Sequence, residues 1–431
     1  IVVVDTGSTD GTVAIDEQYG ARIGNIPCID DFAAARNACL PLATGAYILW
    51  LDADERLAPG AGPGLRAAAA SGIDCGMLPL HAVRTAGASA KQVLSGQERI
   101  GAPVLLARFA RKTPDLRWQG RVHESWRDWM RRPGRRIARV HADILHDGTA
   151  PGVRDPEVRR TRNVALLRLR AAEEPDDVLS RGYLAIDLYN SGARAEARRF
   201  AAEALAILRQ QATTPEGIAQ PGAAVPAVTV YGWAAVADGR HADARDAAAL
   251  LRDRGSVHPN LAWVVGVAEE NIALRCARDQ RAAALIRAEA AYTEALAVEG
   301  RVFAQAVMDD ARGAPLRVRL GTVRLQRGDA PGALEYADAA LALSPDDGPA
   351  TLLRVEALID LGRHAEALSQ VEPHLGPVAA DAWLLAAAAA MPADPSTGRA
   401  LLARAHALAR EHLRGLHRLS RLNGLLAASA D

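Results

Sequence analysis

The distribution of apolar and polar positions divides the chain into two parts. Residues 1 to about 150 alternate short apolar runs with Gly-, Pro- and Asp-containing turns, a pattern typical of strands joined by loops and helices. From about residue 156 onward the sequence is rich in Ala, Leu and Arg, with apolar residues at helical spacing. The Pro- and Gly-containing segment 149–156 predicts a linker between the two parts or the entry to a helix. We therefore expect an α/β domain over residues 1–155 and an all-α domain over residues 156–431.

The first apolar run predicts a strand that is followed by a loop and a helix. Residues 1–4 are β-branched, as in a parallel strand covered on both faces, and residues 5–12 (DTGSTDGT) favour a turn. Residues 13–20 then predict a helix. In open α/β sheets, ligands bind beyond the carboxyl ends of the strands, so this unit suits a nucleotide. An ordinary strand–turn–helix connection is the alternative interpretation.

A second predicted strand, residues 47–51, ends in the acidic run Asp52-Ala53-Asp54-Glu55. Side chains two positions apart in an extended segment point to the same side. Two carboxylates placed in this way repel each other unless a cation lies between them. Mg²⁺ and Mn²⁺ accept carboxylate and phosphate oxygens together, so either ion suits this position.

A predicted helix over residues 30–45 lies between these two segments, with Asp30 or Asp31 near its start. Arg36 lies inside it. An arginine can bind a diphosphate through two parallel hydrogen bonds. The alternative is a surface arginine on an amphipathic helix.

The second part of the chain contains repeats. LGTVRLQRGDAPGALEYADAALALSPDD (320–347) and RVEALIDLGRHAEALSQVEPHL (354–375) place Gly328 and Gly362 34 positions apart. A helix–turn–helix unit of this period resembles the tetratricopeptide repeat, which stacks into a solenoid because one unit cannot bury its apolar face alone. Binding or dimerising is the usual role, and a purely structural appendage is the alternative. Looser matches cover residues 188–205 and 233–251, a polar insertion covers 210–226, and a final helix pair is expected over 383–410.

Composition excludes several classes of protein. The 431 residues carry 51 basic and 51 acidic side chains, so nothing favours a nucleic-acid partner, and the locally basic segment 131–139 is interpreted as a solvated face. The four cysteines form no CxxC motif, which argues against disulfides and zinc. Apolar runs stay shorter than the roughly 18 residues that would predict a membrane span. A cytoplasmic setting is expected.

Three motifs in order, VVDTGSTDGT (3–12), DDFAAARN (30–37) and ATGAYILWLDADE (43–55), resemble the family 2 glycosyltransferases of GT-A fold. The closer likeness is to the bacterial subgroup with a C-terminal tetratricopeptide region. The resemblance implies a Rossmann-like nucleotide-diphospho-sugar transferase domain followed by an all-α tetratricopeptide-like solenoid. It implies that Asp5 contacts the uracil or ribose and that Arg36 lies near the diphosphate. It also implies that Asp52 and Asp54 form the metal and ribose motif, with Asp54 the direct metal ligand.

Later segments extend the resemblance. APVLLARFARK (102–112) is similar to the strand before the acceptor site, and RWQGRVHESW (117–126) contains the subgroup's Trp-x-Gly-x-x-His-Glu pattern. The resemblance implies that Glu124 is the general base of an inverting displacement. His123 would orient this base or meet phosphate. A glutamate in a salt bridge with nearby arginines is the alternative for Glu124. In VHADILHDG (140–148), His146 is the implied third metal ligand, or else a capped-strand histidine.

The resemblance sets further expectations. Family members begin one strand and one helix earlier, so we expect this chain to be N-terminally incomplete, and Thr6 stands where many members have a second acidic residue. The predicted function is hexosyl transfer from a nucleotide-sugar donor, a UDP-sugar, to a protein, peptide or glycan acceptor, assisted by Mg²⁺ or Mn²⁺. A homodimer through the repeats is expected. Residues 84–97 are interpreted as a flap over the sugar or an idle loop. A tetratricopeptide scaffold with a degenerate, inactive transferase domain is the alternative function.

Overall fold

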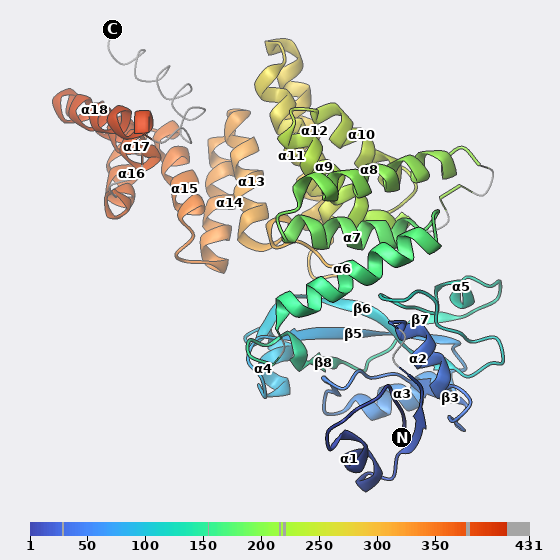
Figure 1. Ribbon diagram of the computed structural model, residues 1–431. Coiled ribbons are helices and arrows are strands. Elements are labelled where there is room, and N and C mark those ends of the chain that lie inside the picture. The colour runs from blue at the N-terminus through green and yellow to red at the C-terminus, as the bar shows by residue number, and fades with distance from the viewer. Residues whose placement is uncertain (28–29, 154, 215–216, 219–220, 376–379, 412–431) are drawn as a thin grey trace. The chain divides into compact units, whose positions relative to one another are not determined.

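The computed structural model describes the chain except for residues 28–29, 154, 215–216, 219–220, 376–379 and 412–431 (Figure 1). Residues group into two compact units. Unit 1 contains Ile1–Asp238, Asp246–His258 and Gly300–Val307, and unit 2 contains Gly239–Arg245, Pro259–Glu299 and the residues from Met308 onward. The domain boundary predicted after residue 155 stays a prediction. The helix that follows it begins at Pro156, after Asp155 accepts hydrogen bonds from the first free N–H groups of that helix.

Unit 1 is built on two sheets. A two-stranded parallel sheet pairs β1 with β2, and a six-stranded sheet has the order β3-β6-β5-β8-β4, with β7 beside β5. Most pairs of the larger sheet are antiparallel, but β5 runs parallel to β7 and β8. The strands are β1 Val2–Asp5, β2 Arg22–Asn25, β3 Tyr47–Leu49, β4 Glu55–Leu57, β5 Cys75–Val83, β6 Arg99–Arg111, β7 Ile137–Arg139 and β8 Ile144–His146.

The predicted first strand is present, but it is not covered on both faces. All four residues of β1 are half-buried, and the preceding Ile1 is 80% exposed. In the described part of the chain β1 pairs with β2 alone. The β-branched composition therefore indicated the strand correctly, whereas the expected burial on both faces was wrong, since all four side chains stay partly exposed.

Short helices connect these strands. The helix predicted over residues 30–45 begins where expected, since the Asp31 carboxylate accepts a 2.9 Å hydrogen bond from the Ala34 N–H. It ends at Cys39, earlier than predicted, because Pro41 has no backbone N–H with which to continue the helical hydrogen bonds. The helices of this region are α1 Thr12–Gln18, α2 Phe32–Cys39, α3 Ala61–Ala70, α4 Ala90–Ser95 and α5 Arg127–Met130.

Two apolar clusters cover the larger sheet. Phe109 belongs to a cluster with Leu78 and Ile144, and the next residue, Ala110, belongs to one with Trp118 and other tryptophans. Successive side chains of a strand point to opposite faces, so the two clusters lie on the two sides of β6. The segment predicted as a flap joins β5 to β6 and contains α4, which Ser89 and Gln92 close with a capping box. Val93 of this helix is fully buried, so the segment is anchored.

The second part of the chain is helical, as predicted. Gly328 and Gly362 have φ angles of +84° and +73°, and each ends the first helix of a pair, where glycine adopts this conformation without strain. The looser matches fall on α7, α8, α9 and α10, and the expected final pair is α17 and α18. The helices are α6 Pro156–Glu173, α7 Val178–Asn190, α8 Arg194–Gln211, α9 Val225–Ala237, α10 His241–Arg252, α11 Pro259–Arg275, α12 Arg278–Ala297, α13 Gly313–Gln326, α14 Ala330–Leu343, α15 Gly348–Asp360, α16 His364–Val371, α17 Ala380–Ala390 and α18 Pro395–Glu411.

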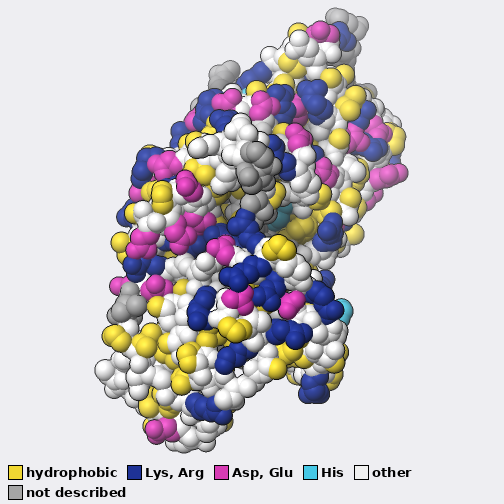
Figure 2. Space-filling model, turned by 90° about the vertical axis from the view of Figure 1, so that its right-hand side faces the viewer, with side chains coloured by type: hydrophobic (Ala, Val, Ile, Leu, Met, Phe, Trp, Pro, Cys, Tyr) yellow, Lys and Arg dark blue, Asp and Glu magenta, His cyan; other side chains and the backbone are white. Residues whose placement is uncertain are grey.

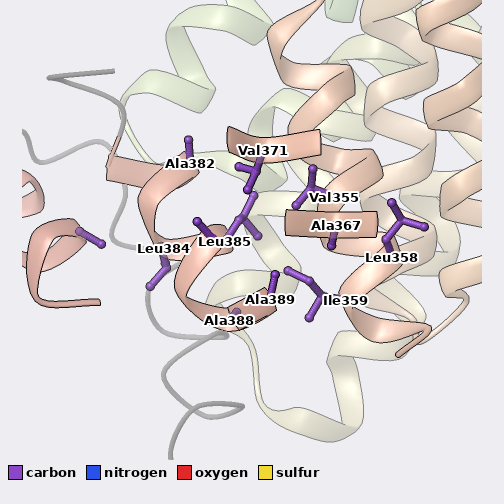
Figure 3. Packing of buried hydrophobic residues seen from close by; sticks show 12 residues of the cluster. Val355, Leu358, Ile359, Ala367, Val371, Ala382, Leu384, Leu385, Ala388 and Ala389 are labelled. Carbon is purple, nitrogen blue, oxygen red and sulfur yellow. The ribbon is translucent and has the colours of Figure 1, made fainter. Parts of the chain in front are cut away.

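Small residues let the helices of unit 2 approach closely. A β-carbon at Gly321 of α13 would lie 2.5 Å from the Leu353 side chain and 3.1 Å from the Ala333 carbonyl oxygen. Leu353 and Ala333 are themselves fully buried. A continuous apolar cluster then runs from α15 to α18 and includes Leu358 and Leu385 (Figure 3). Each pair thus buries its apolar stripe against the next, as a stacked repeat requires.

The segment Gly300–Val307, which we call the returning segment, belongs to unit 1 although it follows α12 in the sequence. The Leu105 N–H of β6 donates a 2.8 Å hydrogen bond to the Phe303 carbonyl oxygen. The Gln305 side chain accepts a 3.0 Å hydrogen bond from the Tyr183 hydroxyl of α7. Unit 1 is therefore assembled from segments that are far apart in the sequence.

The basic segment 131–139, which was predicted to be a solvated face, forms several ion pairs. Figure 2 shows Lys and Arg side chains gathered on the face where α5 and β7 lie, with Asp and Glu side chains between them. Arg135 contacts Asp115 at 2.8 Å, and Arg131 contacts Asp128 at 3.6 Å. In the described residues, no helix is long and apolar enough to span a membrane.

Candidate active site

A cavity of about 810 Å³ opens within unit 1. Strand ends, the loop after β6, the helices α6 and α7, and the returning segment all contribute side chains to its wall. Six of the seven predicted site residues line it, namely Arg36, Asp52, Asp54, His123, Glu124 and His146. These six residues therefore converge on one cavity, although they are spread over more than a hundred positions of the sequence.

Asp5 is the predicted site residue that does not line this cavity. Its carboxylate closes its own loop by accepting hydrogen bonds from the Gly7 N–H at 2.9 Å and the Ser8 N–H at 3.0 Å. Hydrogen bonds from the Ser8 side chain and from these two N–H groups lower the pKa of Asp5. The residue thus shapes the turn after β1, and its predicted contact with a nucleotide stays a prediction.

Asp52 lies between two arginines. Its Oδ1 is 3.0 Å from Arg36 Nη2, and its Oδ2 is 3.1 Å from Arg108 Nη2. The Trp50 indole N–H donates a further 2.9 Å hydrogen bond to Oδ1. Burial opposes the charge on this carboxylate, but Arg36 and Arg108 outweigh it and hold the pKa of Asp52 below its ordinary value. Asp52 is therefore an anion whose oxygens are already occupied.

Glu55 contacts both Arg108 and the backbone of Asp52. Only 1% of its side chain is exposed, its Oε1 lies 2.5 Å from Arg108, and its Oε2 accepts a 3.0 Å hydrogen bond from the Asp52 N–H. Burial raises the pKa of Glu55, and the neighbouring Asp52 charge adds to the shift, while Arg108 opposes it. Arg108 thus joins both ends of the acidic run and fixes its backbone.

Arg36 extends this network to the loop after β6. Its guanidinium contacts Asp52 on one side and forms an ion pair with Glu124 on the other. The guanidinium carbon also lies 4.4 Å from the centre of the Trp50 ring, a distance typical of a cation–π contact. The charges therefore alternate from Glu55 through Arg108, Asp52 and Arg36 to Glu124.

Asp54 points to a different partner. His146 Nε2 lies 3.2 Å from Asp54 Oδ2, and the Asp54 carbonyl oxygen accepts a 2.9 Å hydrogen bond from the Asp147 N–H. The pairing of β4 with β8 produces this contact, since Glu55 stands opposite His146 in the register. Gly148 leaves the space that Asp54 occupies, because a β-carbon there would overlap the carboxylate. Among the described residues, no group of three or more His, Cys, Asp or Glu side chains forms a ready metal centre.

The Trp-x-Gly-x-x-His-Glu motif gains a physical explanation. Trp118 packs between Trp50 and Trp126, with ring centres 5.1 and 4.8 Å away. Its backbone exchanges two hydrogen bonds with the Asn37 side chain, at 2.9 and 3.0 Å, and this joins the loop to α2. Gly120 has a φ of +90°, which a residue with a side chain rarely adopts. The loop is therefore fixed at its start by packing and by a conformation suited to glycine.

His123 lies half-buried in the cavity wall. Its ring stacks on Tyr183 at 3.9 Å between centres, and its φ of +51° is uncommon for a residue other than glycine. Burial lowers the pKa of His123 to about 4, and Arg170 and Arg159 add to the shift, so the ring is neutral at pH 7. Within the described residues, Nε2 of this ring has no hydrogen-bond partner. A neutral ring of this kind can orient its neighbours but cannot pair with phosphate as a cation.

Several residues of the cavity were not predicted from the sequence. Arg108 lies inside a predicted strand, and a charged side chain among apolar strand residues is a usable signal. Tyr183 and Gln305 come from helices and connections that were assigned to the repeats. Nothing in their local sequence marks them, because the contact depends on how the chain folds back.

Comparisons with known proteins agree with the two-part organisation. Residues 1–78 match the model of the family described as Glycosyl transferase family 2. A TPR repeat-containing protein of Synechococcus elongatus is 38% identical over 124 residues. That match spans 29% of this chain and 28% of the relative, so the chain covers little more than a quarter of that protein.

Solved helical-repeat proteins are also similar. A thermophilic TPR protein of Thermus thermophilus covers 54% of this chain and 100% of its own, with 20% identity and a TM-score of 0.34. A tetratricopeptide repeat protein of Parabacteroides merdae covers 64% and 94%, with 12% identity and a TM-score of 0.40. These scores are low, so the description of the repeats rests on the helix pairs themselves.

Proposed function

We propose that this chain, a family 2 glycosyltransferase region followed by tetratricopeptide-like repeats, transfers a sugar from a nucleotide-sugar donor to an acceptor in the cavity of unit 1. The single observation that carries the proposal is the convergence of Arg36, Asp54, Glu124 and His146 on one cavity. A UDP-sugar and an inverting displacement of hexosyltransferase type are the specific forms that we propose. A cytoplasmic setting and a homodimer through the repeats stay predictions.

The donor's diphosphate would meet Arg36 and the acidic run. Arg36 is a planar donor that already bridges two carboxylates, and phosphate oxygens are equally good acceptors for it. Asp52 keeps this guanidinium in place, while Arg108 and Trp50 hold Asp52. Asp52 therefore serves the donor through Arg36.

The divalent ion is best matched by Asp54 and His146. Their facing atoms, a carboxylate oxygen and an imidazole nitrogen 3.2 Å apart, are both metal ligands, and they line the cavity. Asp52 fits this role less well, because both of its oxygens are engaged by arginines. Bound Mg²⁺ or Mn²⁺ would neutralise charge that develops on the leaving diphosphate. Asp54 and His146 would otherwise keep each other oriented.

Glu124 is the proposed base. It lies in the cavity wall beside His123, and its present partner is Arg36. When phosphate oxygens draw on Arg36, the Glu124 carboxylate gains freedom to accept a proton from the acceptor. His123 is proposed to orient this loop, and its unpartnered Nε2 suits a hydrogen bond with an acceptor hydroxyl or amide. The acceptor is a polypeptide side chain or a glycan.

The test is metal-dependent nucleotide binding followed by donor turnover. UDP binding is measured by calorimetry with Mn²⁺ and with EDTA, and UDP release is then followed with a panel of UDP-sugars. We expect Asp54→Ala to lose metal-dependent binding, and Glu124→Gln to keep binding but lose turnover by about 10² to 10⁴. Asp279→Asn, an exposed carboxylate in α12, is the matched control. Absence of any UDP binding by the unaltered chain would reject the proposal in favour of a repeat scaffold with an inactive transferase region.

A further inference from the structure

We propose that Arg170, in the first helix of the repeat region, is a positioning residue for the proposed base Glu124. The inference deepens the proposed function and rests on it. Arg170 does not touch the donor site. It acts through the backbone of residues 120–127, which we call the base loop.

Arg170 is bonded directly to the base loop. Only 1% of its side chain is exposed, and its Nη1 donates hydrogen bonds to the carbonyl oxygens of Val122 at 2.8 Å and His123 at 3.3 Å. These two residues immediately precede Glu124. Because both acceptors are backbone atoms, Arg170 fixes the path of the chain into Glu124 whatever the neighbouring side chains do.

Arg170 is itself held rigidly. Its Nη2 lies 3.0 Å from Asp177 Oδ2, and its Nε and Nη2 each lie 3.3 Å from Glu174. Asp177 also contacts Arg127 at 3.1 Å, at the far end of the base loop. Burial opposes the charge on Asp177, but Arg170 and Arg127 prevail and hold the pKa of Asp177 below its ordinary value. The Asp177 carboxylate thus connects Arg170, which bonds the backbone of the base loop, with Arg127, the last residue of that loop.

The base loop is shaped to receive this arginine. A β-carbon at Gly120 would overlap the Arg170 guanidinium, so the glycine of the motif makes room for it. Arg121 adds an outer contact by pairing with Glu173 through two hydrogen bonds, at 2.6 and 2.7 Å. The unusual φ of His123 is stabilised from the other side by the ring of Tyr183. An unusual backbone conformation persists where its surroundings enforce it, and here α6 and α7 supply those surroundings.

The geometry indicates more than general packing. A buried arginine needed only for stability could bond any carbonyl oxygens, whereas Arg170 bonds the two that lead directly into Glu124. Glu124 must point at the acceptor hydroxyl when it accepts the proton, and small displacements of a base reduce the rate steeply. The first repeat is thereby part of the catalytic apparatus.

The test compares Arg170→Met, Arg170→Lys and Asp177→Asn in the full chain, with the donor and Mn²⁺ chosen by the screen for the proposed function. Arg168→Met is the matched control, because Arg168 lies in the same helix and pairs with Glu196 at 2.7 Å, away from the base loop. Asn is as good a helix N-cap as Asp, so Asp177→Asn loosens Arg170 while it keeps the start of α7. This variant serves if Arg170→Met fails to fold.

We expect kcat for UDP release to fall at least tenfold in Arg170→Met and Asp177→Asn. The donor KM and the metal-dependent UDP affinity should change less than about twofold. Arg170→Lys, which keeps one charged donor, should recover part of kcat. Equal losses of kcat and UDP affinity, or an unchanged kcat in folded variants, would overturn the inference alone. Absence of turnover by the unaltered chain would instead reject the proposed function, and the inference with it.

Discussion

Arg36 and Glu124 form an ion pair in which 14% and 7% of the two side chains are exposed. Arg36 belongs to α2 and Glu124 to the base loop, so the pair joins two segments that carry different parts of the proposed chemistry. A charge left behind at such a largely buried position is poorly compensated, and the partners therefore depend on each other.

Replacing Arg36 by Met should leave Glu124 and Asp52 as uncompensated anions. We expect the free energy of unfolding to fall by about 3 kcal/mol, as for other broken buried pairs. The double variant Arg36→Met/Glu124→Gln should recover at least about 1 kcal/mol of this loss, because it removes one of the stranded charges. Urea denaturation of the unaltered chain, Arg36→Met, Glu124→Gln and the double variant measures the coupling free energy between the two side chains. Strictly additive effects would show that the two side chains do not interact.

Gly148→Ala should disturb the proposed metal ligand without altering any ligand atom. The added β-carbon would overlap the Asp54 carboxylate and also lie 3.0 Å from His146 Nε2, so the pair must move apart. We expect Mn²⁺-dependent UDP affinity to fall at least tenfold while metal-free affinity stays constant. Gly348→Ala is the control, since nothing lies within 4 Å of a β-carbon there. Equal affinities for Gly148→Ala and the unaltered chain would count against Asp54 and His146 as ligands.

His123 makes stability depend on pH in a defined window. The ring takes up a proton near pH 6.5 when unfolded, but burial lowers the pKa in the folded chain to about 4. The contribution of the neutral ring to the free energy of unfolding is therefore complete above pH 6.5. It is lost as the pH falls toward 4, by roughly 3 kcal/mol in all. His123→Asn removes the titrating group, and Asn tolerates a positive φ. Hence the stability difference between the unaltered chain and His123→Asn should shrink between pH 6.5 and 4.

Denaturant unfolding at several pH values checks this expectation. His141→Asn, which removes an exposed imidazole, is the control for the loss of a histidine. A difference that stayed constant across the window would mean that His123 is accessible to protons in the folded chain.

Leu353→Ala should destabilise unit 2 and leave the proposed site unchanged. Leu353 is fully buried beside Gly321, so its truncation leaves a cavity that costs about 2–5 kcal/mol. Calorimetry should show a lower unfolding temperature, whereas UDP binding should be unaffected below that temperature. Leu343→Ala, at a position 57% exposed at the end of the preceding helix α14, should have little effect. Loss of UDP binding by folded Leu353→Ala would show that unit 2 also supports the site.

The Cys75 thiol should be unreactive in the native protein. It is fully buried, and desolvation, with the Asp74 charge adding to it, raises its pKa to about 12. Since the thiolate is the nucleophile, alkylation at pH 8 should modify Cys75 only after unfolding. Peptide mass spectrometry after brief treatment with iodoacetamide measures this. Rapid native modification of Cys75 would mean that the core under β5 opens readily.

Local sequence patterns predicted the elements and most of the polar residues that meet in the cavity. Gly328 and Gly362 marked the repeat because the end of a helix favours glycine locally. The acidic run marked a strand end because charged residues directly follow an apolar run. The convergence of Arg36, Asp54, Glu124 and His146 in one cavity could be expected from ordered motifs. Which arginine pairs with which carboxylate could not be predicted, because the sequence offers several arginines for each carboxylate.

The contribution of the repeats to the site lay beyond sequence analysis. Arg170 and Tyr183 look like ordinary residues of amphipathic helices, and their importance depends on tertiary contacts with the base loop. The full burial expected for β1 was wrong for a related reason. Composition shows that a strand is apolar, but the number of its neighbours is a property of the whole fold.

The returning segment has a consequence for the order in which the chain can fold during synthesis. Leu105 and Tyr183 obtain partners from Phe303 and Gln305, which leave the ribosome only after α11 and α12 have been made. Contacts between such distant positions form late because a long loop must close first. Until then the Leu105 N–H of β6 has no partner from the returning segment, so this part of the strand is exposed to other nascent chains and to chaperones. Shortened chains that end before residue 300 should therefore be aggregation-prone even if every proposed active-site residue is present.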